Sequence, residues 1–336
     1  MGARVPMANA RTILVATGAS PALEPAVPGI EYAITSNEAF DLPELPKRLL
    51  IVGGGYIAVE FASLFARLGV QVSMCMRADN ILRGFDEDLR DALQDSMAKR
   101  GIRLITDTVF ASVARAGDGL AVRTKTGETL AADQVLLAIG RDANTAGLGL
   151  ENAGVKLTPS GHVAVDRYSR TSAENIYAVG DVIGFPALAS AAYVQGRYAA
   201  GHALGGDVQR SMLRNIPTGI YASPEISSVG RTERELTEAK IPYEIGHAQY
   251  KNLARAQITG QTAGMLKLLF HRETLEILGV HCFGANAAEI IHIGQAILSQ
   301  PAPVNSLLYF INTTFNYPTM AEAYRVAALN GYNRLF

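Results

Sequence analysis

Residues 48–60 read Arg-Leu-Leu-Ile-Val-Gly-Gly-Gly-Tyr-Ile-Ala-Val-Glu, and this stretch decides the fold. The apolar run 49–52 predicts a strand that is buried on both faces, as in a parallel sheet. A helix is expected from Tyr56 to about Leu68. Between them, Gly53-x-Gly55-x-x-Ala58 matches the dinucleotide fingerprint in the strand–turn–helix context that it requires. The sequence therefore predicts a dinucleotide-binding unit, and the alternative is a glycine-rich turn that binds nothing.

Each residue of this fingerprint has a physical task. Gly53 makes the tight turn, Gly55 lets the backbone approach a pyrophosphate, and Ala58 lets the helix pack closely on the strand. Tyr56 and Ile57 begin the helix, where free N–H groups and the positive end of the helix dipole attract a diphosphate. We expect these five residues to border the nucleotide.

The residues after the second strand, 71–76, indicate which nucleotide binds. An NAD site usually carries an acidic residue there to hold the ribose 2′-hydroxyl. Here Arg77 follows the strand and Arg83 comes shortly after it. Guanidinium groups suit a 2′-phosphate, so the pattern favours NADP(H) over NAD(H). Asp79 is an alternative partner for Arg77 or for a 2′-hydroxyl. The alternative to an NADP(H) site is two solvated arginines.

Other apolar runs outline the rest of the chain. A short buried strand is expected over 11–21, and further strands over 134–140 and 175–180. An amphipathic helix is expected over 86–100, because apolar residues recur there at helical spacing. From about residue 216 a separate α+β unit is expected, with strands over 265–270 and 277–283 and helices over 286–298 and 320–329.

Composition excludes several classes of protein. The chain has 336 residues, which suggests about two domains, and its 49% hydrophobic share provides a core. Its net charge of −1 lacks the basic excess of a nucleic-acid-binding protein, so no nucleic-acid partner is expected. No apolar run approaches the length of a membrane helix, and residues 1–10 show no secretion leader. We expect a cytoplasmic location and no membrane partner.

Cysteine and histidine usage points away from disulfides and metals. Two cysteines, Cys75 and Cys282, are too few for a disulfide scaffold, so a reducing compartment is expected. Both are interpreted as small buried residues. The six histidines are scattered and form no zinc-binding motif, so no metal is expected. Charged residues over 231–240 are interpreted as a solvated helix face with i,i+3 and i,i+4 ion pairs.

Three strand ends, each closing in glycine, carry a family resemblance. They are Ala16-Thr17-Gly18, Ala138-Ile139-Gly140-Arg141 and Tyr177-Ala178-Val179-Gly180-Asp181. With the fingerprint between the first two, the chain resembles the pyridine-nucleotide disulfide oxidoreductases, which are FAD flavoproteins. Residues 11–182 look like glutathione-reductase members of this family. Residues from about 180 to the end look more closely like its transhydrogenase members.

The resemblance implies an α/β fold with three parts. A Rossmann-like NAD(P)-binding domain (46–139) is inserted in a partial FAD-binding domain (1–45 and 140–205). An α+β dimerisation domain (206–336) follows and implies a homodimer or a higher homo-oligomer. The family's own FAD-binding glycine motif comes before the Thr17-Gly18 strand, where this sequence has only about ten residues. We therefore expect the FAD-side sheet to have an exposed edge.

The resemblance also assigns roles around the flavin. Asp181, after Gly180, looks like the aspartate that binds the FAD ribityl chain, and its alternative is a helix-capping aspartate. A helix starting near Ala187, including Ala189, would aim its N-terminus at the flavin. Glu60 resembles a glutamate that reaches toward the flavin edge, or is a solvated helix residue. Tyr56 matches the aromatic lid of the nicotinamide pocket; the other expected cofactor-binding positions are Thr17, Gly18, Gly140 and Arg141.

Two departures from the disulfide reductases decide the expected chemistry. The two cysteines are far apart in the sequence, so no redox-active pair is present in these residues. Tyr317 stands before Pro318 where those enzymes place a histidine acid/base, with Glu322 retained, and tyrosine is a poor thiol base at neutral pH. Transhydrogenase members look the same here, so the expected function is FAD-dependent hydride exchange between NADPH and NAD. Alternatives are a glutathione-reductase-like enzyme without its cysteine pair and a non-catalytic NADP-binding dimer.

Overall fold

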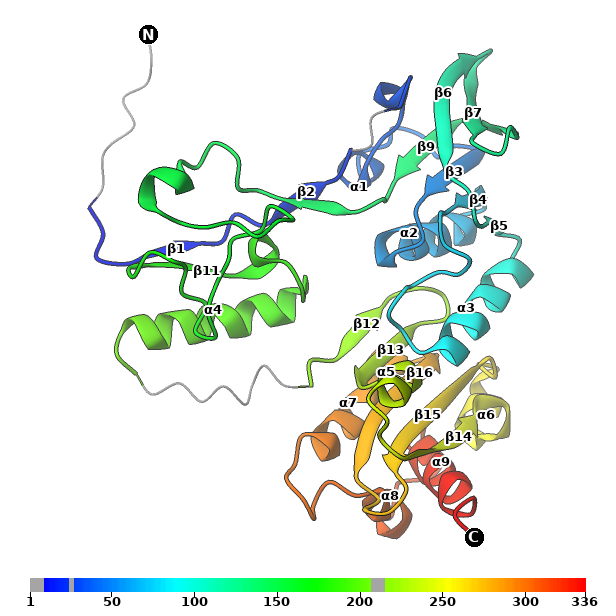
Figure 1. The fold of residues 1–336 in the computed structure, drawn as a ribbon. Helices are drawn as coiled ribbons and strands as arrows, with labels where there is room; N and C mark the ends of the chain where they lie inside the picture. Colours follow the sequence, from blue (N-terminus) through cyan, green and yellow to red (C-terminus); the bar gives the residue numbers. More distant parts are fainter. Residues whose placement is uncertain (1–8, 24–26, 207–214) are drawn as a thin grey trace. The chain divides into compact units, whose positions relative to one another are not determined.

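The computed structural model describes residues 9–23, 27–206 and 215–336 (Figure 1). The chain divides into two compact units, each built from two segments. Unit 1 comprises residues 1–20 and 141–214, and unit 2 comprises 21–140 and 215–336. The expectation of no leader concerns residues 1–10, and residues 1–8 lie outside the described ones. No helix in the described ranges is long and apolar enough to cross a membrane.

The N-terminal part of unit 2 (residues 27–140) is a Rossmann-like layer structure. Its parallel sheet has the order β5-β4-β3-β9, formed by β3 (Arg48–Val52), β4 (Gln71–Cys75), β5 (Arg103–Ile105) and β9 (Gln134–Leu137). One face carries α2 (Tyr56–Arg67) and α3 (Glu87–Lys99), whose apolar residues share a core with the strands. The other face packs on an antiparallel sheet of β6 (Phe110–Ala116), β7 (Gly119–Thr124) and β8 (Thr129–Ala132). Two short elements, η1 (Ile30–Tyr32) and α1 (Ser36–Ala39), precede β3.

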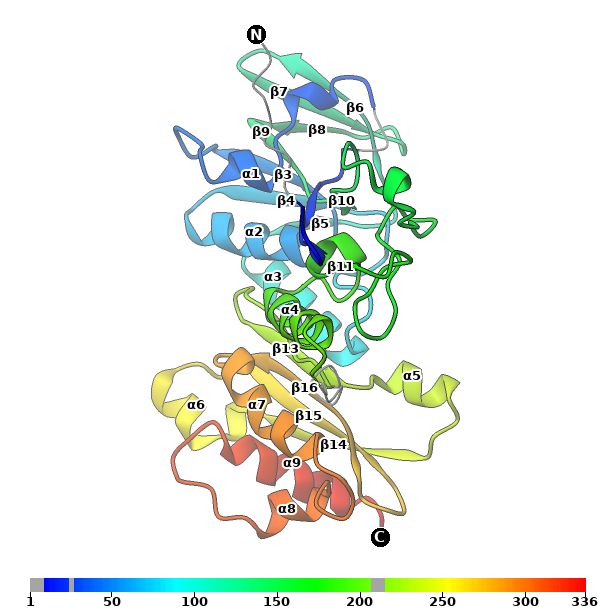
Figure 2. The same ribbon diagram turned by 90° about the vertical axis from the view of Figure 1, so that its left-hand side faces the viewer.

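The C-terminal part of unit 2 (residues 215–336) is built on an antiparallel sheet of order β12-β13-β16-β15-β14 (Figure 2). The strands are β12 (Thr218–Ile220), β13 (Ile226–Gly230), β14 (Tyr243–Gln249), β15 (Gly264–His271) and β16 (Ile277–Gly284). The helices are α5 (Glu233–Glu238), α6 (Ala254–Thr259), α7 (Ala287–Leu298), α8 (Leu307–Asn312) and α9 (Glu322–Tyr332), with η5 (Tyr250–Asn252) before α6. Residues of α6 to α9 share one core with the strands.

The alternation of side chains along β15 divides this sheet into two faces. Leu266, Leu268 and Phe270 belong to the core beneath α7, α8 and α9. Met265 packs instead against the core of the N-terminal part. Lys267, two residues further, is on the same face as Met265 and is fully buried. One face of the sheet therefore meets the helices, and the other meets the N-terminal part of unit 2.

Unit 1 has a smaller core of its own. β1 (Ile13–Val15) and β11 (Ile176–Ala178) form a parallel pair in which Ile13 is opposite Ile176. The other elements are β2 (Ala19–Pro21), β10 (Arg141–Ala143), η2 (Leu150–Ala153), η3 (Gly180–Ile183) and α4 (Ala189–Ala203). The buried residues of its main apolar cluster are Leu150, Val155, Val163, Ile176, Ala178 and Val182.

The helix predictions for unit 2 are confirmed, and one strand prediction is wrong. Helices are found at Glu87–Lys99, Ala287–Leu298 and Glu322–Tyr332, close to the expected ranges. Residues 11–21 do not form one buried strand: they form β1 and β2, and Ile13 and Leu14 are 44% and 47% exposed. The reason is that β11 is the only strand paired with β1 in the described part of the chain.

Candidate functional site

The glycine-rich turn has the geometry of a nucleotide cradle. Gly53 has φ +134°, and a Cβ there would lie 2.2 Å from the Ala138 carbonyl oxygen, so only glycine fits this close crossing of β3 and β9. Gly55 is different, because a Cβ there would meet no described heavy atom within 4 Å. The space over Gly55 is therefore open to a ligand.

The helix that follows the turn presents its N-terminus to this space. Gly55 is the N-cap of α2, and no side chain in the described ranges caps its first turn. Ala58 is fully buried against the sheet, Ile57 is half-buried, and Tyr56 is 39% exposed at the start of the helix. Uncapped N–H groups at the start of a 12-residue helix form a ready site for a diphosphate.

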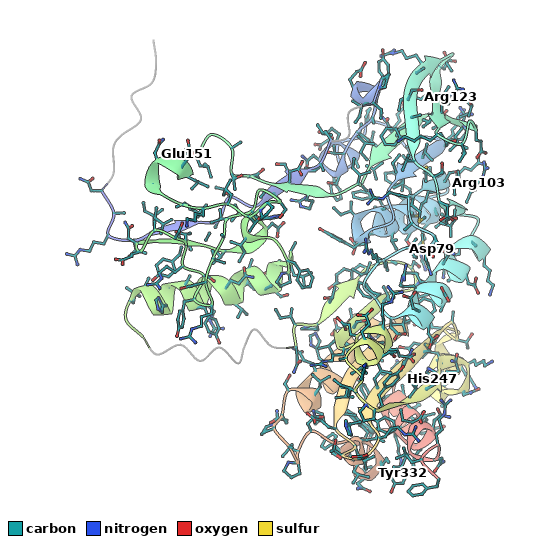
Figure 3. The ribbon with its side chains drawn as sticks, in the orientation of Figure 1. Asp79, Arg103, Arg123, Glu151, His247 and Tyr332 are labelled. Carbon is teal, nitrogen blue, oxygen red and sulfur yellow. The ribbon has the colours of Figure 1, made fainter. Side chains whose placement is uncertain are left out.

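The β4–α3 loop (residues 76–86) carries the two arginines expected to select the nucleotide. Val52 of β3 is opposite Cys75 of β4, so the loop begins beside the glycine-rich turn. The Leu82 N–H donates to the Gly54 carbonyl at 2.7 Å and holds the loop there. Arg77 and Arg83 are exposed, and across residues 27–206 and 215–336 neither is ion-paired. Asp79, labelled in Figure 3, does not neutralise Arg77.

A buried cluster around Lys267 lies at the C-terminal end of this loop, and no sequence motif predicts it. Lys267 Nζ donates to Asp86 Oδ1 at 2.8 Å, to Asp88 Oδ2 at 2.7 Å and to Glu233 Oε1. Burial alone would lower the pKa of Lys267, but Asp86 and the other two carboxylates outweigh it and raise the pKa. The only signal in the sequence is one lysine inside the apolar run 266–270.

Strand pairing brings two histidines to the sides of Lys267. His247 on β14 and His281 on β16 are both opposite Lys267, and Ser228 on β13 is opposite His281. His281 Nε2 lies 2.9 Å from the Arg231 carbonyl, which only accepts, so Nδ1 accepts from the Ser228 hydroxyl at 3.0 Å. Burial lowers the pKa of His281 and of His247, so both favour the neutral form beside the lysine.

The charged segment 231–240 is not a solvated face of local ion pairs, as the sequence analysis expected. Arg234 pairs with Glu87 at the start of α3, and Glu233 pairs with Lys267 on β15. Both partners are far away in the sequence, so spacing within α5 could not reveal them. The helix connects the two parts of unit 2.

In unit 1, Asn144 forms hydrogen bonds with Thr17 and Gly18, the first of the three strand ends that carry the family resemblance. The side-chain amide of Asn144 donates to the Thr17 carbonyl at 2.9 Å, and the main-chain carbonyl of Asn144 accepts from the Thr17 hydroxyl at 2.8 Å. The Asn144 N–H donates to the carbonyl of Gly18, whose φ is +70°. No motif in the sequence predicts this role for Asn144, because an isolated asparagine in a loop has no distinctive pattern.

The Gly180-Asp181 segment gathers polar groups beside an open helix end. Gly180 has φ +75°, and its N–H donates to Gln195 Oε1 at 2.8 Å. Asp181 lies in η3 and does not cap a helix; its Oδ2 is 3.5 Å from Arg141 Nε. That Nε is buried and has no hydrogen-bond partner among the described residues. α4 begins at exposed Ala189 rather than near 187, and no described side chain caps it.

The three catalytic candidates, Glu60, Tyr317 and Glu322, form no hydrogen bonds with one another in the described part of the chain. Glu60 Oε1 accepts from the Tyr221 N–H at 2.9 Å, so it is neither a free carboxylate nor a merely solvated one. Burial raises its pKa, while that hydrogen bond acts in the opposite direction. Tyr317 is 67% exposed, and Glu322 begins α9 with a buried Oε2 that has no partner in the described ranges. No hydrogen bond joins Tyr317 to Glu322 in that same part of the chain.

Both cysteines are buried, as expected. Cys75 lies at the end of β4 and Cys282 in β16, and neither is exposed. Burial raises the pKa of Cys75 to about 11 and that of Cys282 to about 12. Thiols with such values stay protonated at neutral pH and do not act as nucleophiles.

Several known proteins are similar to this chain in sequence. The soluble pyridine nucleotide transhydrogenase of Marinobacter nauticus is 52% identical over 96% of this chain and 70% of its own length. The protein of that name from Hahella chejuensis is 50% identical over 97% of this chain and 70% of its own. These identities extend over both the segment resembling glutathione reductase and the segment resembling transhydrogenases.

Solved structures support the same assignment. LpdA from Mycobacterium tuberculosis superposes with a TM-score of 0.87 at 34% identity, over 97% of this chain and 70% of that one. The flavoprotein disulfide reductase RclA from Escherichia coli gives 0.88 at 28% identity, over 95% and 73%. Residues 7–196 match the model "Pyridine nucleotide-disulphide oxidoreductase", and 216–328 match the dimerisation domain of that family. The chain belongs to the pyridine nucleotide-disulphide oxidoreductase family.

Proposed function

We propose that this protein is an FAD-dependent pyridine nucleotide transhydrogenase, which passes hydride between NADPH and NAD by way of a flavin. The observation that carries the proposal is the combination of an open Gly55 cradle with buried, unreactive cysteines. The expected oxidoreductase function is also supported by relatives of about 50% identity along nearly the whole chain.

The nucleotide site is proposed at the carboxyl ends of β3 and β4. Gly53 allows the tight turn beside Ala138, Gly55 leaves room for the pyrophosphate, and the first turn of α2 supplies N–H donors to it. Arg77 and Arg83 would pair with the 2′-phosphate of NADP(H). NAD(H) lacks that phosphate and would bind through the remaining contacts.

The residues of unit 1 fit a flavin. Asp181 offers an acceptor for the ribityl hydroxyls. Arg141 Nε, 3.5 Å from Asp181 Oδ2, is a buried donor without a hydrogen-bond partner among the described residues. The uncapped start of α4 at Ala189 would stabilise negative charge on a reduced ring. Thr17 and Gly18 are proposed to border the same cofactor, and Gly140, in unit 2, stays a proposed cofactor-binding position. When bound, FAD would accept hydride from one nicotinamide and return it to the other.

A disulfide reductase is the second candidate, and the thiols argue against it. A dithiol mechanism needs a reactive thiolate, whereas burial keeps both thiols of this chain protonated. Tyr317 cannot replace a histidine acid/base at neutral pH. The transhydrogenase reaction needs orientation rather than thiol chemistry.

Several finer expectations stay proposals. We propose a homodimer through residues 206–336, with Tyr317 and Glu322 near the partner's flavin. The domain boundaries at 45, 139 and 205, the likeness of residues 11–182 to glutathione reductase and a cytoplasmic location are predictions of the same kind. A sedimentation experiment that finds a monomer at micromolar concentration would exclude the dimer.

Nucleotide analysis in the absence of oxygen tests the proposed reaction directly. The protein is supplied with FAD, NADPH and NAD under nitrogen. The proposal predicts one NADH formed for each NADPH oxidised, with the four nucleotides separated by chromatography. Bound NADPH with no NADH formed would contradict transhydrogenation and leave a non-catalytic binding protein.

A further inference from the structure

The β4–α3 loop is held at two places, near its middle and at its C-terminal end. Near its middle, the Leu82 N–H donates to the Gly54 carbonyl, and Arg90 Nε donates to the Ile81 carbonyl at 2.6 Å. Asn80 Nδ2 donates to Asp91 Oδ1 at 2.6 Å, which ties the loop to α3. These bonds fix residues 80–82 against the glycine-rich turn on one side and against α3 on the other.

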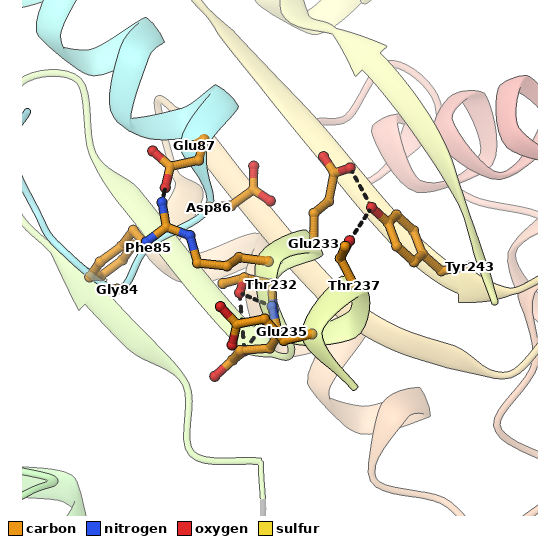
Figure 4. Close-up of a pocket in the computed structure, with 11 residues that line it drawn as sticks. Gly84, Phe85, Asp86, Glu87, Thr232, Glu233, Glu235, Thr237 and Tyr243 are labelled. Atoms are coloured by element: carbon orange, nitrogen blue, oxygen red, sulfur yellow. Dashed lines mark hydrogen bonds and ion pairs between the residues drawn. The ribbon is translucent and has the colours of Figure 1, made fainter. Parts of the chain in front are cut away.

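The second fastening comes from the C-terminal part of unit 2. Asp86, the last residue of the loop, accepts from Lys267, and both side chains are only 1% exposed. Glu87, the first residue of α3, pairs with Arg234 of α5 (Figure 4). Figure 4 also shows Tyr243 donating to Glu233, a carboxylate that Lys267 shares. The loop end is therefore held by charges from β15 and α5.

The loop has a conformation that needs such support. Leu82 has φ +51°, a region that leucine rarely adopts, and Gly84 has φ +99°. Arg83 stands between these two residues, and its position depends on both turns. Glycine adopts a positive φ freely, but a leucine persists in this region only where its surroundings hold it.

We propose that Lys267 is a positioning residue for nucleotide selection: it anchors Asp86 and Asp88 and thereby fixes Arg83 where it receives a ribose 2′-phosphate. The inference rests on the proposed function, because it takes NADP(H) as a ligand of this loop. A loop held in place loses less conformational entropy when the phosphate binds, so anchoring raises affinity for the phosphorylated nucleotide. A nucleotide without the 2′-phosphate gains little from the same anchor.

The test compares two probes that differ by one phosphate, adenosine 2′,5′-bisphosphate and AMP, by isothermal titration of the full chain. K267M is expected to weaken binding of the bisphosphate about tenfold and that of AMP less than about twofold. K251M, which removes an exposed lysine of the same part of the chain, is the matched control and leaves both unchanged. E233Q removes one partner of Lys267 and is expected to act in the same direction but less, which covers the case in which K267M does not fold.

A double-mutant cycle with R83A separates positioning from general damage. If Lys267 acts through Arg83, K267M changes bisphosphate affinity in the wild type but not in the R83A background. Equal losses in both backgrounds, or equal losses for the two probes, would overturn the inference. If R83A and R77A leave bisphosphate binding unchanged, the NADP assignment of the proposed function fails, and the inference falls with it.

Discussion

Lys267 Nζ lies 2.8 Å from Asp86 Oδ1, and neither side chain is more than 1% exposed. The two residues are 181 positions apart and belong to different parts of unit 2. The second oxygen of Asp86 has no hydrogen-bond partner among the described residues, so the lysine is the main compensation for this buried charge. This ion pair connects the antiparallel sheet to the loop that follows β4.

Removal of the lysine should destabilise unit 2. K267M leaves a buried carboxylate without its cation, and breaking such a pair costs about 3 kcal/mol. Urea unfolding of K267M, compared with the exposed-site control K251M, measures the difference. A loss below about 0.5 kcal/mol would show that water or rearrangement replaces the lysine.

Substitution of the two glycines of the turn should have different effects: G53A should lower stability, and G55A should lower nucleotide affinity. G53A places a Cβ 2.2 Å from the Ala138 oxygen at φ +134°, so it should cost about 3 kcal/mol of stability. G55A meets no described atom and should change stability by less than about 1 kcal/mol. Its Cβ fills the space for the pyrophosphate, so NADPH affinity should fall at least about tenfold. NADPH binding by G55A at wild-type strength would place the nucleotide elsewhere.

Glu60 should give the stability of unit 2 a specific pH dependence. Because burial raises its pKa above 4.5 in the folded state, the folded protein binds the extra proton, and stability falls as pH rises through the folded pKa. E60Q keeps an acceptor for the Tyr221 N–H and removes this loss. Its urea midpoint, relative to wild type, should therefore rise between pH 4.5 and pH 7. The exposed-site variant E44Q should show no such trend; the same trend in E44Q would refute the assignment to Glu60.

The two cysteines should not react with thiol reagents in the native protein. With the pKa of Cys75 raised to about 11 and that of Cys282 to about 12, the thiolate fraction at pH 8 is small, and burial blocks access. An aromatic disulfide reagent should titrate two thiols per chain in guanidinium and none without it. Fast reaction of one native thiol would reopen the disulfide-reductase alternative.

The sequence predicted the local parts of this site and missed the long-range ones. The β3–α2 unit and α3 follow from apolar periodicity and glycine chemistry, which are local properties. Lys267 was not identified, because its three carboxylates come from α3, its flanking loop and α5, and only the strand order brings them together. β1 has an apolar sequence but is exposed, because burial depends on neighbours that a short run does not specify.

The visible absorption spectrum of the purified protein, after addition of FAD and desalting, tests the central claim most directly. The account predicts a retained flavin band that NADPH bleaches and NAD restores, without added thiols. A protein that binds NADPH but retains no flavin, or whose flavin NADPH does not bleach, would contradict the assignment as a flavin-dependent transhydrogenase.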